Sequence, residues 1–174
     1  MRIGLVSGEY PPDQGGVGDF TREIGKALAA LGHDVHVITG KSQIVRLSAH
    51  DEVANLKSQI AVHREVSNWD WGCWKQIRQI AQRERLDVLN VQFQTAAYGM
   101  HPAINLVPKR RSRPPVAATF HDLKEPYLFP KAGALRWWVI KTLAQRAEGV
   151  IVTNIEDEIK ISGLQSPISN LVRI

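Results

Sequence analysis

The sequence has a single cysteine, Cys73, among its 174 residues. One cysteine excludes a disulfide within the chain and fits a reducing compartment. The sequence also lacks any uninterrupted apolar run that approaches about 18 residues, the length expected of a membrane-spanning helix. The first predicted strand begins at Arg2, and no charged and then apolar leader precedes it. We therefore expect a cytoplasmic protein.

The chain has no internal repeat and no low-complexity tract, and its acidic residues are outnumbered. Lys and Arg total 22 against 17 Asp and Glu, which gives a net charge of +5 and a pI near 9.6. A basic balance of this kind favours anionic partners, such as phosphorylated ligands, acidic lipid surfaces or, less specifically, nucleic acid. The hydrophobic content of 44% is enough for one domain with its own core.

The segment 1–39 predicts a strand, a glycine-rich loop, a helix and a second strand. An apolar run within 2–7 is typical of a buried parallel strand. Gly32 stands where a left-handed helix C-cap is favoured, and an apolar run at 35–38 returns the chain to the sheet. The helix between them has one apolar face, made by Phe20, Ile24, Ala27, Leu28 and Leu31.

The loop before this helix contains Gly15, Gly16 and Gly18. Glycine can take positive φ and lets the main chain approach a ligand closely. Unpaired amides and the positive end of a helix dipole favour an anion at such a place, most often a phosphate. The alternative is a loop that only turns the chain tightly, and three glycines in four positions favour ligand contact.

Strands and helices alternate along the rest of the chain. Further strands are predicted at 60–66, 87–93, 116–120, 150–153 and 168–174, with 60–66 nearer the sheet edge than the first strand. Helices are predicted within 67–86, at 102–107, 135–147 and 156–161, and the connection 40–59 could hold a short helix at 49–56. This alternation predicts an α/β fold, a Rossmann-like parallel sheet with helices on both faces.

Three segments carry a family resemblance: 1–7 (MRIGLVS), 15–20 (GGVGDF) and 28–39 (LAALGHDVHVIT). Together they resemble the N-terminus of the large retaining glycosyltransferase family with the GT-B architecture, of the group 1 or family 4 type. The resemblance implies that 1–174 is a single Rossmann-like N-terminal domain, and that a C-terminal nucleotide-sugar domain with a glutamate-rich motif is absent. It also implies that Gly15 and Gly16 lend backbone amides to the diphosphate of the donor.

A second motif, 118–122 (ATFHD), follows a buried strand. Ligand-facing groups of α/β sheets collect at the carboxyl ends of the strands. The motif resembles the fifth-strand signature of the same family, which implies that His121 lies at the reaction centre near the donor sugar and hydrogen-bonds it, with Asp122 as a sugar contact. The alternative is a His-Asp pair that only closes the end of the strand.

Other polar residues near the predicted carboxyl edge are candidates for acceptor contacts. Of Gln92 and Gln94, only one can face the cleft, because alternate side chains of a strand point to opposite faces. We choose Gln94, although many relatives have histidine in this region. Asn154 replaces a serine-rich signature and is a weak candidate. The first loop offers Glu9, Tyr10 and Asp13, of which Asp13 is also a good turn former.

The tryptophans and a basic loop allow two interpretations. Trp69, Trp71 and Trp74 crowd one loop-to-helix junction, and Trp137 and Trp138 lie near another helix start. With the basic loop 109–113, they could form a membrane-interface belt facing anionic lipid. We favour core packing for Trp74 and Trp138, with a solvated basic loop.

The sequence therefore predicts the acceptor-binding half of a retaining glycosyltransferase, inactive alone. By resemblance, its partners are a nucleotide-diphosphate sugar, shared with the missing domain, and an unknown acceptor. The family often glycosylates lipid-linked acceptors at a membrane surface, which would place the protein peripherally at the inner membrane face. We expect no nucleic acid partner. We expect no cofactor and no metal, since His33, His36, His50, His63 and His101 show no ligand spacing.

Two alternatives remain. One is an NAD(P)-binding oxidoreductase domain, which is disfavoured because Thr21 stands where the third glycine belongs and no acidic residue ends the second strand. The other is a non-catalytic flavodoxin-like binding module, for which Asp122 is the only candidate phosphoacceptor.

Overall fold

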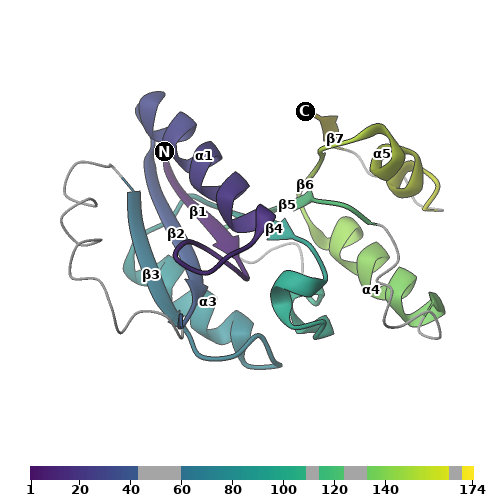
Figure 1. Ribbon diagram of the computed structural model, residues 1–174, viewed down its shortest axis with the longest axis horizontal. Coiled ribbons are helices and arrows are strands. Elements are labelled where there is room, and N and C mark those ends of the chain that lie inside the picture. The colour runs from purple at the N-terminus through teal and green to yellow at the C-terminus, as the bar shows by residue number, and fades with distance from the viewer. Residues whose placement is uncertain (43–59, 109–113, 124–132, 165–169) are drawn as a thin grey trace.

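A computed structural model describes residues 1–42, 60–108, 114–123, 133–164 and 170–174, and for 133–136 the backbone alone. The strands of this part of the chain form one parallel seven-stranded sheet in the order β3-β2-β1-β4-β5-β6-β7 (Figure 1). The strands are β1 (Arg2–Ser7), β2 (Asp34–Gly40), β3 (Ile60–Val66), β4 (Val88–Phe93), β5 (Val116–Phe120), β6 (Gly149–Val152) and β7 (Leu171–Arg173).

The sheet reverses its order between β1 and β4. The chain runs outward from β1 to β2 and β3, and then returns to place β4 on the other side of β1. Open α/β sheets bind ligands beyond the carboxyl ends of the strands at such a switch point. The predicted parallel α/β fold is confirmed, and β3 is the edge strand, as expected.

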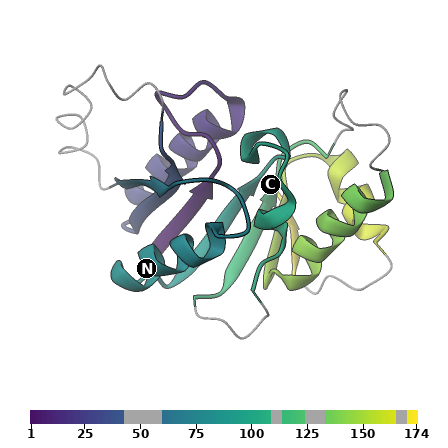
Figure 2. The ribbon, with the colours of Figure 1, turned by 90° about the horizontal axis from the view of Figure 1, so that it is seen from below.

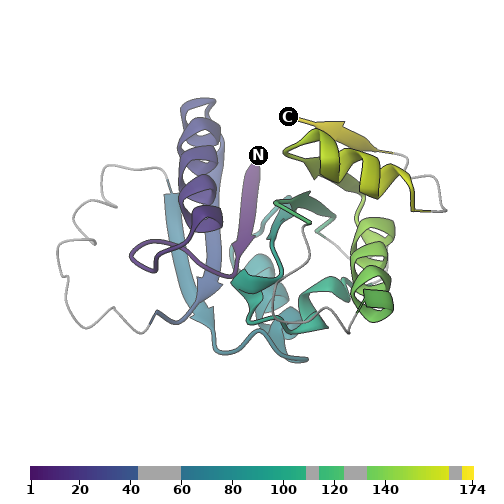
Figure 3. The ribbon, with the colours of Figure 1, turned by 45° about the vertical axis from the view of Figure 1, so that its right-hand side comes forward.

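Helices cover both faces of the sheet (Figure 2). One face packs against α1 (Gly16–Ala30), and the other packs against α3 (Cys73–Arg83) and α4 (Gly133–Arg146). Two short 3₁₀ helices, η1 (Ala96–Tyr98) and η2 (Pro102–Asn105), follow β4, and α5 (Ile155–Ser162) follows β6. Figure 3 shows α1 (purple) and α4 (green) far apart, with strands of the sheet between them.

The buried stripe of α1 differs in part from the predicted one. Ile24 and Leu28 pack against the sheet as expected, but Ala27 is exposed and Leu31 is 74% exposed. The prediction failed at Leu31 because the helix ends at Ala30, so Leu31 serves as its C-cap residue. Gly32 follows with φ of +83°, the left-handed conformation that the sequence predicted.

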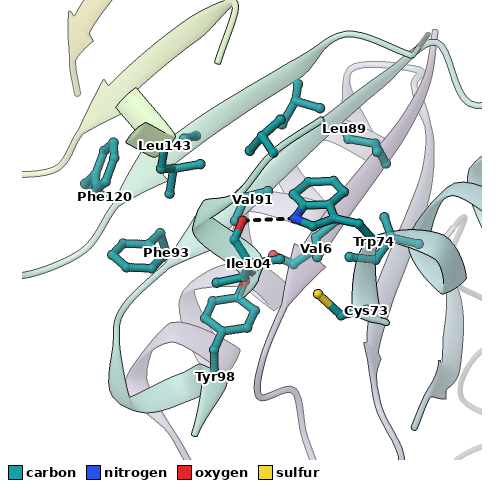
Figure 4. Close-up of a cluster of buried hydrophobic side chains, with 14 of the residues drawn as sticks. Val6, Cys73, Trp74, Leu89, Val91, Phe93, Tyr98, Ile104, Phe120 and Leu143 are labelled. Carbon is teal, nitrogen blue, oxygen red and sulfur yellow. Dashed lines mark hydrogen bonds between the residues drawn. The ribbon is translucent and has the colours of Figure 1, made fainter. Parts of the chain in front are cut away.

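The larger core lies between the sheet and α3, η2 and α4 (Figure 4). Trp74 of α3 is buried there, as predicted, and its indole Nε1 donates hydrogen bonds to the carbonyls of Ala103 and Ile104 at 3.1 and 3.2 Å. The prediction for Trp138 is wrong, because this side chain is 54% exposed. The buried face of α4 includes Ile140, and Trp138 stands two positions earlier, about 200° around the helix.

Several predictions fall on residues outside the described part of the chain. These are the short helix at 49–56, the basic loop 109–113 and the start of the last strand at 168–169. No described helix is both long enough and apolar enough to cross a membrane.

Candidate functional site

The glycine-rich loop joins β1 to the first turn of α1. Gly15 is the N-cap residue, and its φ of 169° is extended backbone, so the expected positive φ is not seen. Gly18 is favoured by a close approach instead, because a Cβ there would lie only 3.1 Å from the Glu9 carbonyl oxygen and from Tyr10 Cα. Gly16 has nothing within 4 Å of a Cβ position, so its backbone borders open space.

The carboxylate of Glu9 lies at the N-terminus of α1. Its Oε1 accepts a hydrogen bond of 3.2 Å from the backbone N–H of Val17, and it fills the space that a side chain at Gly15 would need. The Ser7 hydroxyl donates to the Glu9 carbonyl at 2.6 Å and fixes the turn. The helix terminus therefore already attracts an anionic group, as its dipole predicts.

His121 follows β5 directly and meets both β4 and α1. Its backbone N–H donates to the Phe93 carbonyl at 2.9 Å, which extends the β4–β5 pairing by one residue. Its Nε2 donates to Oε1 of Gln92 at 2.8 Å, since an amide oxygen only accepts. Its ring packs edge-on against Phe20, with centroids 4.6 Å apart.

The contact with Phe20 brings the first turns of α1 and the end of β5 to the same rim of the sheet. Burial lowers the pKa of the His121 imidazole to about 4, although Asp157 acts in the opposite direction. The ring is therefore neutral near pH 7, with Nε2 protonated and Nδ1 able to accept a hydrogen bond. A neutral imidazole can position a hydroxyl group but is a poor general acid.

A cavity of about 490 Å³ opens beyond the carboxyl ends of β1, β2 and β3. Asp13 lines it, and its carboxylate accepts a hydrogen bond of 2.5 Å from the Ser42 hydroxyl. Tyr10 instead is 6% exposed and packs into the core on the α1 side. The other lining residues are Gly8, Gly40, Lys41, Val66, Ser67, Asn68, Trp69, Asp70, Tyr98, Gly99 and His101.

The structure places the remaining candidates as follows. Gln92, rather than Gln94, is buried and contacts His121, while Gln94 is half-buried just beyond β4. Asp122 is exposed, and its φ is +55°. Non-glycine residues rarely adopt this left-handed conformation, and those that do are concentrated at functional sites. Asn154 caps α5, because its Oδ1 accepts from the Asp157 N–H at 2.8 Å.

Sequence reasoning did not find the Gln92 and Phe20 contacts of His121. The sequence interpretation assigned Gln92 and Gln94 to opposite faces, which is wrong, because residues two positions apart on a strand share a face. Alternation therefore could not show which of them contacts His121. Phe20 carried a helical core signal, and nothing local distinguishes a core phenylalanine from one that packs on a site histidine.

A family model described as Glycosyltransferase Family 4 matches residues 14–155. Similar solved structures include sucrose-phosphate synthase from Thermosynechococcus elongatus, with 16% identity and a TM-score of 0.68, covering 100% of this chain and 47% of that chain. Another is HepE from Anabaena in complex with UDP-glucose, with 18% identity and a TM-score of 0.59, covering 100% of this chain and 43% of that one.

The chain thus spans just under half the length of each of these structures, and at such identities the likeness concerns the fold. A search of curated protein sequences gave no significant match. The fold is that of one Rossmann-like half of a GT-B enzyme, and the family model covers most of the chain. The chain belongs to glycosyltransferase family 4.

Proposed function

We propose that this chain is the acceptor-binding half of a retaining glycosyltransferase, which transfers a sugar from a nucleotide-diphosphate donor to an acceptor hydroxyl. The observation that carries the proposal is the Phe20–His121 contact, which unites the glycine-rich N-terminus of α1 with the end of β5 on one rim. Membership of the family, and a structural neighbour solved with UDP-glucose, support the nucleotide sugar as donor. Both favour this function over an NAD(P)-binding or flavodoxin-like domain.

In this proposal, the backbone amides of Gly15 and Gly16 face the donor diphosphate. Fixed amide dipoles stabilise the charge that grows on the leaving diphosphate as the sugar departs. The open space beside Gly16 is where a phosphate can approach the main chain. The Glu9 carboxylate must then yield its place at the helix terminus or stand beside the diphosphate, where it opposes binding.

The neutral His121 is proposed to hydrogen-bond a hydroxyl of the donor sugar, with Asp122 beside it. Gln92 fixes the ring orientation through Nε2, which leaves Nδ1 to accept from the hydroxyl. Asp13, Tyr10 and Gln94 remain proposed acceptor contacts. Of these, Asp13 has the most direct support, since it lines the cavity over β1, β2 and β3.

The test is an NMR titration of the labelled chain with UDP and with UDP-glucose, with NADH as a comparison ligand. We expect both uridine ligands to shift the amides of Gly15, Gly16 and His121. Gly16→Ala should weaken this binding, because its methyl group enters the phosphate space, without loss of stability, because that space is open. Glu9→Gln should strengthen binding by removing a negative charge.

Gly149→Ala is the matched control, because its Cβ would meet only Ala117 Cβ at 3.9 Å, an ordinary contact in β6. The proposal is contradicted if millimolar UDP leaves the 15–18 and 121 amides unshifted, or if Gly16→Ala and Gly149→Ala bind equally well.

A further inference from the structure

Two histidines that are far apart in the sequence meet on neighbouring strands, away from the carboxyl edge of the sheet. In the β2–β3 pairing, Ile38 lies opposite His63 and His36 lies opposite Ala61, so the two imidazoles lie diagonally on one face. His36 Nδ1 and His63 Nε2 are 3.0 Å apart, and the two ring planes are nearly parallel, with an interplanar angle of 7° and centroids 5.3 Å apart. His36 is 3% exposed, so this pair is largely enclosed.

A carboxylate completes the cluster. Glu84 is the C-cap residue of α3, which packs against this face of the sheet. One ligand atom from each of His36, His63 and Glu84 lies within 4.8 Å of the others. We infer that His36, His63 and Glu84 form a binding site for a divalent transition metal ion, with Zn²⁺ as the best fit.

The separation of the two inner nitrogens suits a tetrahedral ion. Zinc–nitrogen bonds of about 2.0–2.1 Å at a tetrahedral angle put two ligand nitrogens about 3.3 Å apart, close to the 3.0 Å observed between the two imidazoles. The two nitrogens are directed at each other, so the rings must turn for both lone pairs to meet one ion. The Glu84 side chain has the freedom to close the remaining distance, because it is partly exposed at a helix end. Two imidazoles and one carboxylate leave a fourth position for water.

The outer ring nitrogens have the partners that metal-bound histidines need. His36 Nε2 lies 3.3 Å from Asp34 Oδ1, and His63 Nδ1 lies 3.6 Å from Glu65 Oε1. A histidine that binds a metal through one nitrogen donates its other N–H to such a carboxylate, which fixes the ring and strengthens the ligand. Asp34 lies within hydrogen-bond reach of His36, and Glu65 lies just beyond it for His63.

Two guanidinium groups also approach the outer nitrogens, Arg2 at 3.2 Å from His36 and Arg83 at 3.3 Å from His63. A guanidinium only donates, so it bonds to an outer nitrogen only when that nitrogen carries no proton. When the inner nitrogens bind an ion, the outer nitrogens of both neutral rings carry the protons. The contacts of Arg2 and Arg83 with the rings are then lost, while both arginines keep their carboxylate partners.

The two arginines do not make the cluster positively charged, because each of them pairs with a carboxylate. Arg2 pairs with Asp34 at 2.9 Å, and Arg83 pairs with Glu65 at 2.6 Å and with Glu84 at 2.8 Å. The three carboxylates outnumber the two guanidiniums. The sequence predicted no metal because the histidines show no ligand spacing along the chain, and the strand pairing brings them together. The inferred site is separate from the sugar-transfer chemistry proposed above.

The experiment is calorimetric titration of the tag-free chain with Zn²⁺, repeated with Co²⁺ while the visible absorption is recorded. We expect one saturable ion per chain and the absorption bands of tetrahedral Co²⁺. His63→Gln should abolish both signals, and Glu84→Gln should weaken Zn²⁺ binding. Asp34→Asn, which acts through His36, should weaken Zn²⁺ binding by about 10- to 100-fold.

His33→Gln is the matched control, because His33 precedes β2 outside the cluster and should leave Zn²⁺ binding unchanged. Circular dichroism in EDTA checks that each variant folds. If His63→Gln does not fold, Glu84→Gln still tests the proposal, because it changes a partly exposed side chain. The proposal is overturned if Zn²⁺ does not saturate one site, or if His63→Gln and Glu84→Gln bind it as the wild type does. Either result would mean that the two rings share a proton instead of a metal ion.

Discussion

His121 is kept neutral by burial between Phe20, Gln92 and the end of β5. The pKa of an ordinary histidine in an unfolded chain is about 6.5, whereas burial lowers the pKa of His121 to about 4. Between these two values the unfolded chain binds more protons than the folded one. The stability that His121 contributes is therefore complete above pH 6.5 and is lost as the pH falls towards 4.

We expect an NMR titration of the His121 imidazole to give a midpoint near pH 4. The free energy of unfolding should also fall more steeply between pH 6.5 and 4 in the wild type than in His121→Asn, which has no such group. An imidazole of His121 that titrates near pH 6.5, or equal slopes for the two proteins, would show that the ring is solvated.

The two tryptophans that the sequence placed in the core make a contrasting pair. Trp74 is buried and donates hydrogen bonds to two carbonyls, whereas Trp138 is largely exposed. Trp74→Phe leaves those carbonyls without their donor and should cost about 1–3 kcal/mol of stability. Trp138→Gln should change stability by no more than about 0.5 kcal/mol. Urea unfolding of both variants measures the difference, and equal losses would contradict the structure.

At the scale of the elements, α5 depends on its cap. Asn154 Oδ1 accepts from the Asp157 N–H, its Nδ2 donates to Asp157 Oδ2 at 2.8 Å, and the buried Asp157 accepts from the Leu123 N–H at 3.0 Å. This network ties the start of α5 to the segment that follows His121. The cap therefore supports both the helix and the site.

Asn154→Ala should cost about 0.5–2 kcal/mol, the range for loss of an N-cap side chain. Asn154→Asp keeps the acceptor oxygen of the cap, but it loses the Nδ2 donor and places a second carboxylate beside Asp157, so it should also be less stable than the wild type near pH 7. Urea unfolding measures both effects. If Asn154→Ala were as stable as the wild type, the cap would contribute nothing.

The order and type of these elements could be predicted from sequence because parallel strands are short apolar runs and amphipathic helices repeat every 3.6 residues. What could not be predicted depends on contacts between elements. Leu31 and Trp138 each satisfy an apolar pattern, yet the end of α1 and the orientation of α4 expose them. The Gln92–His121 and His36–His63 pairs arise from strand pairing, which local periodicity does not encode.

The same division applies to the candidate site. The glycine-rich loop and His121 carry motifs that a sequence displays directly, and the Phe20–His121 contact brings their elements together. The positive φ expected in the loop is absent, because the helix begins at Gly16 and absorbs Gly16 and Gly18. That Glu9 would occupy the helix terminus could not be predicted, since its hydrogen bond with the Val17 N–H joins residues eight positions apart, which no local pattern encodes.

At the scale of the whole molecule, the proposed function makes this chain one side of the cleft that binds the donor. The chain spans just under half the length of the structures it resembles, and its proposed contribution to the donor is limited to backbone amides and one neutral histidine. A departing nucleotide diphosphate needs several preorganised donors to offset its growing charge. Two amides in an open rim, next to the Glu9 carboxylate, cannot supply that stabilisation alone.

We therefore expect the purified 174-residue chain to show no sugar transfer from UDP-glucose to a panel of hydroxyl acceptors, even where NMR detects weak UDP binding. Radiolabelled donor and long incubation make the assay sensitive, and His121→Ala identifies activity from contaminating enzymes, which it would leave unchanged. Transfer that the wild type performs and His121→Ala abolishes would contradict the expectation. It would show that this half alone assembles the reaction centre, with His121 and the loop as its essential parts.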